Sequence, residues 1–157
     1  MIILPSRYIF ILGIIIQEII RFPHRSRHQR VWRDNKITEN RIQKLDIILD
    51  GFAFAGLYLI PPIYAFSSIL KYADYDQPGW IPWVGVLVLI FATILLWKAH
   101  QDLQDSYTPT LHIQEDHKLV TSGVYSRIRH PVYASVWLTA LAQALLLGNW
   151  IAGFAGL

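Results

Sequence analysis

The sequence predicts an all-α protein, a polytopic membrane helix bundle with about four transmembrane helices, and three observations support this fold class. Of the 157 residues, 54% are hydrophobic and only 16% are charged, whereas roughly a quarter of the residues of an average soluble domain are charged. The apolar residues gather in four stretches, which excludes a disordered chain. The basic residues concentrate in alternate connections between these stretches, as in proteins that cross a membrane several times. The length suits a single domain over residues 1–157.

The four apolar stretches define the expected helices. The first covers residues 8–20 and the last covers residues 132–147, and both are short for a bilayer span, so part of each could lie in the interface. The stretches 45–70 and 80–97 reach the length of about 20 residues that crosses the hydrocarbon layer. Buried helices of a soluble bundle are the alternative, but residues 84–96 lack the polar face that such helices carry.

The charges of the connections predict which helix ends face the cytoplasm. The segment 21–44 carries eight Lys and Arg residues, the segment 98–131 carries four, and the segment 71–79 carries one. Because cytoplasmic loops are enriched in Lys and Arg, we expect an integral, multi-pass protein with segments 21–44 and 98–131 in the cytoplasm. No stacking platform of aromatic residues accompanies the basic segment, so contact with anionic membrane lipids explains it better than contact with nucleic acid.

The connection before the last apolar stretch holds the candidate functional residues. Residues 106–133 are too many for a simple turn, and loops of this length in compact proteins are usually functional or disordered. Gly123 would allow a tight turn or the close approach of a ligand. Pro131 suits the first position of the following helix, and the free N–H groups of a helix start favour anionic groups.

Two runs in this connection resemble the signature of the isoprenylcysteine carboxyl methyltransferase family, whose wider group of integral-membrane methyltransferases includes phospholipid N-methyltransferases. They are residues 117–125 (HKLVTSGVY) and residues 129–133 (RHPVY). The pattern is H-x-L-V-x-x-G-x-Y followed by R-H-P-x-Y, and it fixes nine positions within seventeen residues. The resemblance covers about residues 106–147.

The resemblance implies S-adenosylmethionine as the methyl donor and segment 106–133 as its cytosolic binding connection before the last helix. The residues that match the donor pocket of the family are His117, Lys118, Leu119, Val120, Tyr125, His130, Pro131, Val132 and Tyr133. Arg129 is the nearest cation inside the motif for holding a substrate carboxylate, with contact to lipid phosphate as its alternative role. We assign no general base, because such an acceptor is already ionised at neutral pH.

The expected activity is methyl transfer to a membrane-embedded acceptor, first of all the C-terminal carboxylate of a prenylated cysteine or a similar small lipophilic carboxylate. A phospholipid or another small lipid is the alternative acceptor. The family also has a later motif with a basic residue and paired glutamates, and nothing here matches it. We therefore expect the domain to be C-terminally incomplete, which leaves an inactive truncated membrane protein as a third interpretation.

Other ligand chemistries find less support in the sequence. The absence of Cys excludes disulfides and thiolate zinc sites. His24 and His28 stand four residues apart, as two metal ligands on one helix face would, but arginines surround them and a closed site needs more ligands. Asp46 and Asp50 have the same spacing and are explained by a position near a helix N-terminus. We expect no metal site.

Overall fold

The computed structural model describes residues 5–34, 44–103 and 122–157, and every regular element within these ranges is a helix. In chain order the elements are α1 (Ser6–Asp34), α2 (Lys44–Phe54), the π-helix η1 (Ala55–Leu59), α3 (Ile60–Phe66), η2 (Lys71–Ala73), α4 (Ile81–Leu103), η4 (Gly123–Ser126), α5 (Pro131–Leu147) and α6 (Trp150–Phe154). The expected all-α class is confirmed for these ranges.

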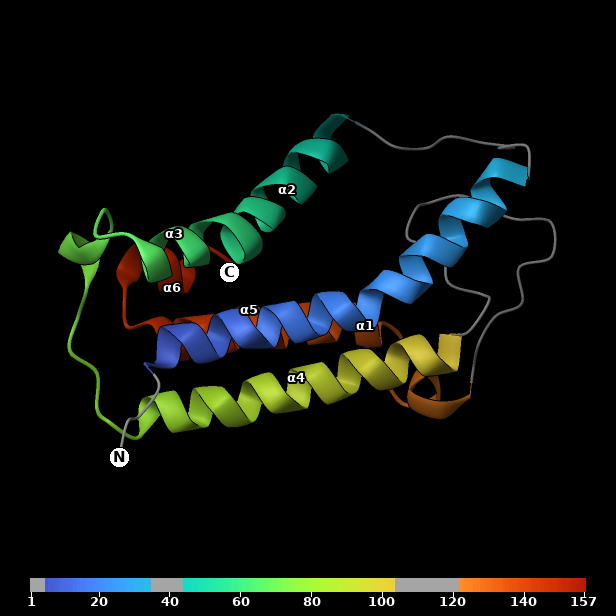
Figure 1. Cartoon of the computed structure of the whole chain (residues 1–157). Coiled ribbons are helices and arrows are strands. Elements are labelled where there is room, and N and C mark those ends of the chain that lie inside the picture. Colours follow the sequence, from blue (N-terminus) through green and yellow to red (C-terminus); the bar gives the residue numbers. More distant parts are fainter. Residues whose placement is uncertain (1–4, 35–43, 104–121) are drawn as a thin grey trace.

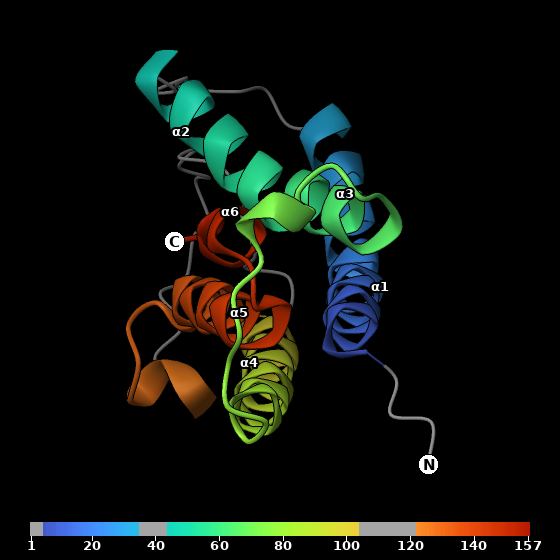
Figure 2. The ribbon, with the colours of Figure 1, turned by 90° about the vertical axis from the view of Figure 1, so that its left-hand side faces the viewer.

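Helices α1, α4 and α5 lie side by side and form the body of the bundle (Figures 1 and 2). The most extensive contact joins α4 to α5, and α5 runs opposite to α1 and α4 (Figure 1). The continuous segment α2–η1–α3 crosses one side of this body, with α6 between it and α5 (Figure 2). The ends of α1 and α4 and the start of α5 therefore share one end of the bundle.

Small side chains allow the close approach of α4 and α5. Ala92 of α4 and Ala142 of α5 are fully buried, and the space beside Gly85 is taken by Leu146. Phe10 of α1 packs against Leu146 in the same apolar cluster. Interfaces rich in small residues are typical of helices that associate in membranes, because dispersion contacts between backbones replace the hydrophobic effect there.

Two segments of the described residues are long and apolar enough to cross a membrane, namely Ile48–Phe66 with 19 residues and Ile81–Leu103 with 23 residues. They correspond to the second and third predicted stretches. Helix α5 is apolar but has 17 residues, and α1 carries Arg7, Glu18 and Arg21 along its apolar part. Two of the four expected transmembrane helices thus meet the length criterion, and the crossing of α1 and α5 stays a prediction.

Helix α1 extends further than the sequence indicated. We expected residues 21–44 to form a connection, but α1 continues through this segment to Asp34. The segment 21–34 contains no Gly and a single Pro, and a run of basic charges alone does not end a helix. The axis of α1 changes direction along its length (Figure 1), and we attribute the bend to Pro23, which cannot donate to the helix ladder.

Both ends of α5 follow local rules. Pro131 occupies the start of the helix as predicted, and Gly148 ends it with φ of 52°, in the left-handed conformation typical of helix C-termini. The next residue, Asn149, is fully buried and accepts hydrogen bonds from the first N–H groups of α6. Its side-chain N–H groups donate to the Leu70 carbonyl and the Asp74 carboxylate, each at 2.7 Å. These bonds fix the loop after α3 to the end of α5 opposite the motif.

Candidate functional site

The predicted site residues that the structure describes all lie between the end of α4 and the first turn of α5. They are Tyr125, Arg129, His130, Pro131, Val132 and Tyr133. The other four predicted donor-binding residues, His117, Lys118, Leu119 and Val120, lie outside the described residues. The motif is therefore seen in its second half only, at the end of the bundle shared by α1, α4 and α5.

The turn at Gly123 is fixed to the end of α4. Gly123 has φ of 60°, a conformation that L side chains rarely adopt, and a Cβ atom at this position would collide with the Asp102 carboxylate. The backbone N–H of Val124 donates to Asp102 Oδ2 at 2.7 Å. Hydrogen bonds to a charged group are about twice as strong as neutral ones, so this contact holds η4 against α4. The glycine of the motif is thus required by backbone conformation and by space.

The start of α5 brings two predicted residues into contact. The rings of His130 and Tyr133 meet edge to face, with centroids 6.0 Å apart and an interplanar angle of 70°. The carbonyl of His130 accepts the N–H of Ala134 at 3.0 Å, and His130 occupies the N-cap position without a side-chain cap. Pro131, between them in the sequence, is buried. The first turn of α5 therefore presents backbone N–H groups and two rings at one place.

The described part of the motif does not enclose a pocket by itself. His130 is exposed, Tyr133 has 70% of its surface exposed, and Tyr125 is half-buried. Arg129 is also exposed and lies next to the helix start. The described residues thus supply one wall, and the donor pocket predicted for this motif stays a prediction.

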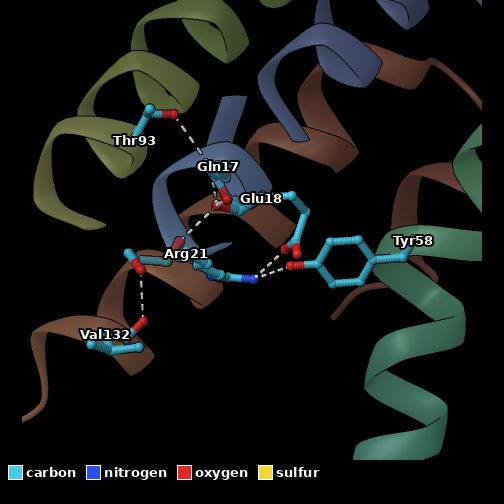
Figure 3. A network of polar contacts seen from close by, with 8 residues as sticks. Gln17, Glu18, Arg21, Tyr58, Thr93 and Val132 are labelled. Carbon is cyan, nitrogen blue, oxygen red and sulfur yellow. Dashed lines mark hydrogen bonds and ion pairs between the residues drawn. The ribbon is translucent and has the colours of Figure 1, made fainter. Parts of the chain in front are cut away.

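A buried polar cluster that the sequence did not predict lies between α1, α4 and α5 and is formed by Gln17, Thr93 and Thr139. Gln17 Nε2 donates to Thr93 Oγ1 at 3.2 Å and to Thr139 Oγ1 at 3.0 Å (Figure 3). Gln17 and Thr139 are almost completely buried. The available signal was a Gln within the apolar run YIFILGIIIQEII, because polar residues within membrane helices usually face the bundle interior and have a role.

A second polar contact joins α1 to the π-helix η1. Arg21 Nη1 pairs with Glu18 Oε1 at 3.0 Å, and the same nitrogen donates to the hydroxyl of Tyr58 (Figure 3). In the sequence, Glu18 lies near the end of the first apolar stretch and Arg21 begins the basic segment 21–44. The structure shows that both contribute to the packing of α1 against η1, at the level where α1 bends away.

An apolar groove of about 280 Å³ lies between α1 and α4. Its lining includes Leu12, Gly13 and Ile16 on α1, and Leu89 and Ile90 on α4. Gly13 leaves room for Leu89, since a Cβ atom there would press on the Leu89 side chain. The groove carries almost no polar surface. Within the described residues no group of three or more His, Asp or Glu side chains could hold a metal ion.

The described part of the chain is a helical bundle with two segments long and apolar enough to cross a membrane, and its described motif residues gather at one end. Residues 83–156 match the isoprenylcysteine carboxyl methyltransferase (ICMT) family. This range runs from the first turn of α4 past the end of α6, and it includes the Gly123 turn and the start of α5. The match over this segment confirms the resemblance inferred from the motif.

Individual relatives agree with the family match. The chain is 31% identical over 113 residues to protein-S-isoprenylcysteine O-methyltransferase B of Arabidopsis thaliana, covering 71% of this chain and 57% of that protein. It is 30% identical over 80 residues to protein-S-isoprenylcysteine O-methyltransferase of Xenopus laevis, covering 50% and 28%. It is 46% identical over 37 residues to the Schizosaccharomyces pombe protein of that name, covering 24% and 16%. The chain thus spans less than two thirds of the length of these relatives.

Proposed function

We propose that the chain is an S-adenosylmethionine-dependent methyltransferase unit of a membrane enzyme, with the C-terminal carboxylate of a prenylated cysteine as acceptor. The observation that carries this proposal is the family match over residues 83–156, which includes the motif. The relatives named above are protein-S-isoprenylcysteine O-methyltransferases. Because this chain covers 57% of the Arabidopsis protein, its own activity is part of the proposal.

The residues present fit a methyl donor of this kind. S-adenosylmethionine supplies an activated methyl group on a sulfonium centre, together with a carboxylate and an aromatic base. The start of α5 has no side-chain cap, so its first N–H groups are suited to a carboxylate. The rings of His130 and Tyr133 offer aromatic surface beside it. His117, Lys118, Leu119 and Val120 would complete the pocket with Tyr125, Pro131 and Val132.

The proposed role of the protein is to align the two reactants and to exclude water from the site. The acceptor carboxylate is ionised at neutral pH, so no residue has to remove a proton from it. Holding two reactants in near-attack geometry supplies a large part of the rate of such displacements. Arg129 is the proposed partner of the acceptor carboxylate, and its exposed position at the helix start leaves it free to meet an incoming anion.

The proposed membrane arrangement follows from the directions of the helices. The ends of α1 and α4 and the start of α5 share one end of the bundle (Figure 1), as the positions of the basic segments 21–44 and 98–131 require for a common cytoplasmic side. The residues near 71–79 and Gly148 lie together at the other end, where the Tyr75 N–H donates to the Gly148 carbonyl at 3.0 Å. A polar donor would then arrive from the cytosol and a prenyl tail from the bilayer.

Donor binding and acceptor choice are tested separately. Isothermal calorimetry with S-adenosylmethionine on the detergent-solubilised chain measures donor binding, and we expect saturable binding at one site. Transfer of a radiolabelled methyl group to N-acetyl-farnesylcysteine, compared with phosphatidylethanolamine, measures the acceptor. If only the phospholipid becomes labelled, the acceptor is a lipid and not a prenylcysteine. An absence of both binding and transfer would contradict the proposed function for this chain.

Substitutions in the motif should weaken donor binding without unfolding the bundle. We expect Tyr125→Ala and His130→Ala each to raise the donor Kd roughly fivefold, the loss that corresponds to one aromatic or hydrogen-bonding contact. The matched control is Tyr72→Ala, because Tyr72 lies in η2 at the other end of the bundle and is 77% exposed. Calorimetry on the three variants checks the expectation. Equal donor affinity in all three and in the wild type would contradict the assigned site.

A further inference from the structure

The hydrogen bonds within the buried cluster of Gln17, Thr93 and Thr139 can all form in only one register of α1, α4 and α5. The side-chain amide of Gln17 has two N–H groups, and one is directed at each threonine hydroxyl, at 3.2 and 3.0 Å. Each hydroxyl has a single hydrogen, which can go to its own helix: Thr93 Oγ1 donates to the Leu89 carbonyl and Thr139 Oγ1 to the Ser135 carbonyl, both at 2.8 Å. Gln17 Oε1 lies 3.3 Å from the Thr139 hydroxyl as an alternative acceptor.

This arrangement is sensitive to small displacements of α5. If α5 slid by one residue or rotated about its axis, Thr139 would leave the amide, and an N–H group of Gln17 would be buried among apolar side chains without a partner. An unpaired buried donor is disfavoured strongly in an apolar environment. Apolar contacts between α4 and α5 are less selective, because many of them involve small alanine side chains that tolerate sliding.

The cluster connects with the turn of α5 that carries the motif. Ser135, which accepts from Thr139 through its carbonyl, donates its own hydroxyl to the Val132 carbonyl at 2.7 Å (Figure 3). Thr139 lies eight residues after Pro131 on a straight helix, or about 12 Å along its axis. A shift of α5 at Thr139 therefore moves His130, Pro131 and Tyr133 by the same amount, relative to the turn that Asp102 holds on α4.

We propose that Gln17 is a positioning residue for the methyl-donor site: its amide, bonded to Thr93 and Thr139, sets the depth and rotation of α5 and so aligns the first turn of α5 with the Gly123 turn. The consequence for donor binding rests on the proposed function. The effect of Gln17 on the position of α5 rests only on the hydrogen bonds described above. Gln17 lies on α1, outside the segment that matches the family.

The matched control is Gln143→Leu. Gln143 is also a fully buried glutamine, but its amide donates to the carbonyls of Gly56 and Ala152, away from the motif. Since the chain contains no Cys, nitroxide labels can be placed on Lys98→Cys and Trp137→Cys without removing native thiols. Lys98 lies on α4 and Trp137 on α5, both positions are exposed, and the labels report the distance between these two helices.

The distribution of distances between the two labels is measured by pulsed electron paramagnetic resonance, and the donor Kd by calorimetry, both in detergent. We expect Gln17→Leu and the milder Thr139→Val to shift or broaden the distribution and to raise the donor Kd about threefold to tenfold, as for the loss of one interhelical hydrogen bond. Gln143→Leu should change neither quantity. The double variant Gln17→Leu/Thr139→Val should raise the donor Kd no further than Gln17→Leu alone, because Thr139 has already lost its hydrogen-bond partner in Gln17→Leu.

Two failures can be told apart. If the unsubstituted chain does not bind S-adenosylmethionine, the proposed function fails, and the distance distribution still decides whether Gln17 positions α5. If Gln17→Leu and Thr139→Val both leave the distribution and any donor affinity unchanged, or if Gln143→Leu changes them equally, the positioning role of Gln17 is overturned.

Discussion

Replacing Gly56 by Ala is expected to lower the apparent Tm of the detergent-solubilised protein by roughly 6–12 °C, which corresponds to about 3 kcal/mol of lost stability for a chain of this size. Gly56 lies in the π-helix η1, where its backbone packs directly on the turn after α6. A Cβ atom at this position would collide with the backbone carbonyl of Ala155. Backbone cannot move aside as a flexible side chain can, so η1 and the C-terminal turn have to separate.

Separation of η1 from the C-terminal turn should also weaken the hydrogen bond between Gly56 and Gln143. The carbonyl of Gly56 accepts the amide N–H of Gln143 at 3.0 Å, and this bond breaks when η1 moves outward. Gly51→Ala is the matched control, because Gly51 lies on the same continuous helical segment with nothing within 4 Å of its Cβ position. An added methyl group on an open helix face stabilises by about 0.5–1 kcal/mol, so the two variants should differ in sign.

Thermal unfolding followed by circular dichroism on both variants checks the expectation. If Gly56→Ala unfolds at the temperature of Gly51→Ala or above the wild type, the close approach of η1 and the C-terminal turn is not required for stability.

The sequence predicted those elements whose limits are local. Pro131 and Gly148 bound α5 because one fits the first turn of a helix and the other adopts positive φ, and both rules act within a few residues. The stretch 80–97 gave α4 because an uncharged run of this length has few alternatives. Gly123 was also predicted to form a turn, and its φ of 60° confirms it.

The features that were missed depend on contacts between distant segments. Nothing local indicates that Asp102 accepts from Val124 or that Gln17 pairs with Thr139, since these contacts form only once η4 packs on α4 and α1 packs on α5. The extension of α1 to Asp34 could not be predicted for another reason: a high density of arginines indicates the membrane side of a segment and not its backbone conformation.

Gly123→Ala is expected to lower donor affinity at least tenfold while leaving most of the bundle folded. Two effects act at the same point. The left-handed conformation costs an alanine about 1–2 kcal/mol, and its Cβ atom would displace the Asp102 carboxylate, which removes the charged hydrogen bond to the Val124 N–H. A bond of this kind contributes about 1.5–3 kcal/mol. The turn would detach from α4, and Tyr125 would be displaced with it.

Gly148→Ala separates the role of this turn from backbone strain. Gly148 has a similar φ of 52°, but the nearest side chain to its Cβ position is the flexible amide of Gln77, at the end of the bundle opposite the motif. The Gly148→Ala variant should lose a comparable amount of stability and keep the donor affinity of the wild type.

Hydrogen exchange at Val124 gives a readout that is independent of donor binding: the amide should exchange faster in Gly123→Ala and in Asp102→Ala, and at the wild-type rate in Gly148→Ala. Because Asp102→Asn keeps an acceptor oxygen but no charge, its exchange rate should fall between these limits. Protection of Val124 retained in Asp102→Ala would mean that the carboxylate does not hold the turn, and the donor site would then need another anchor on α4.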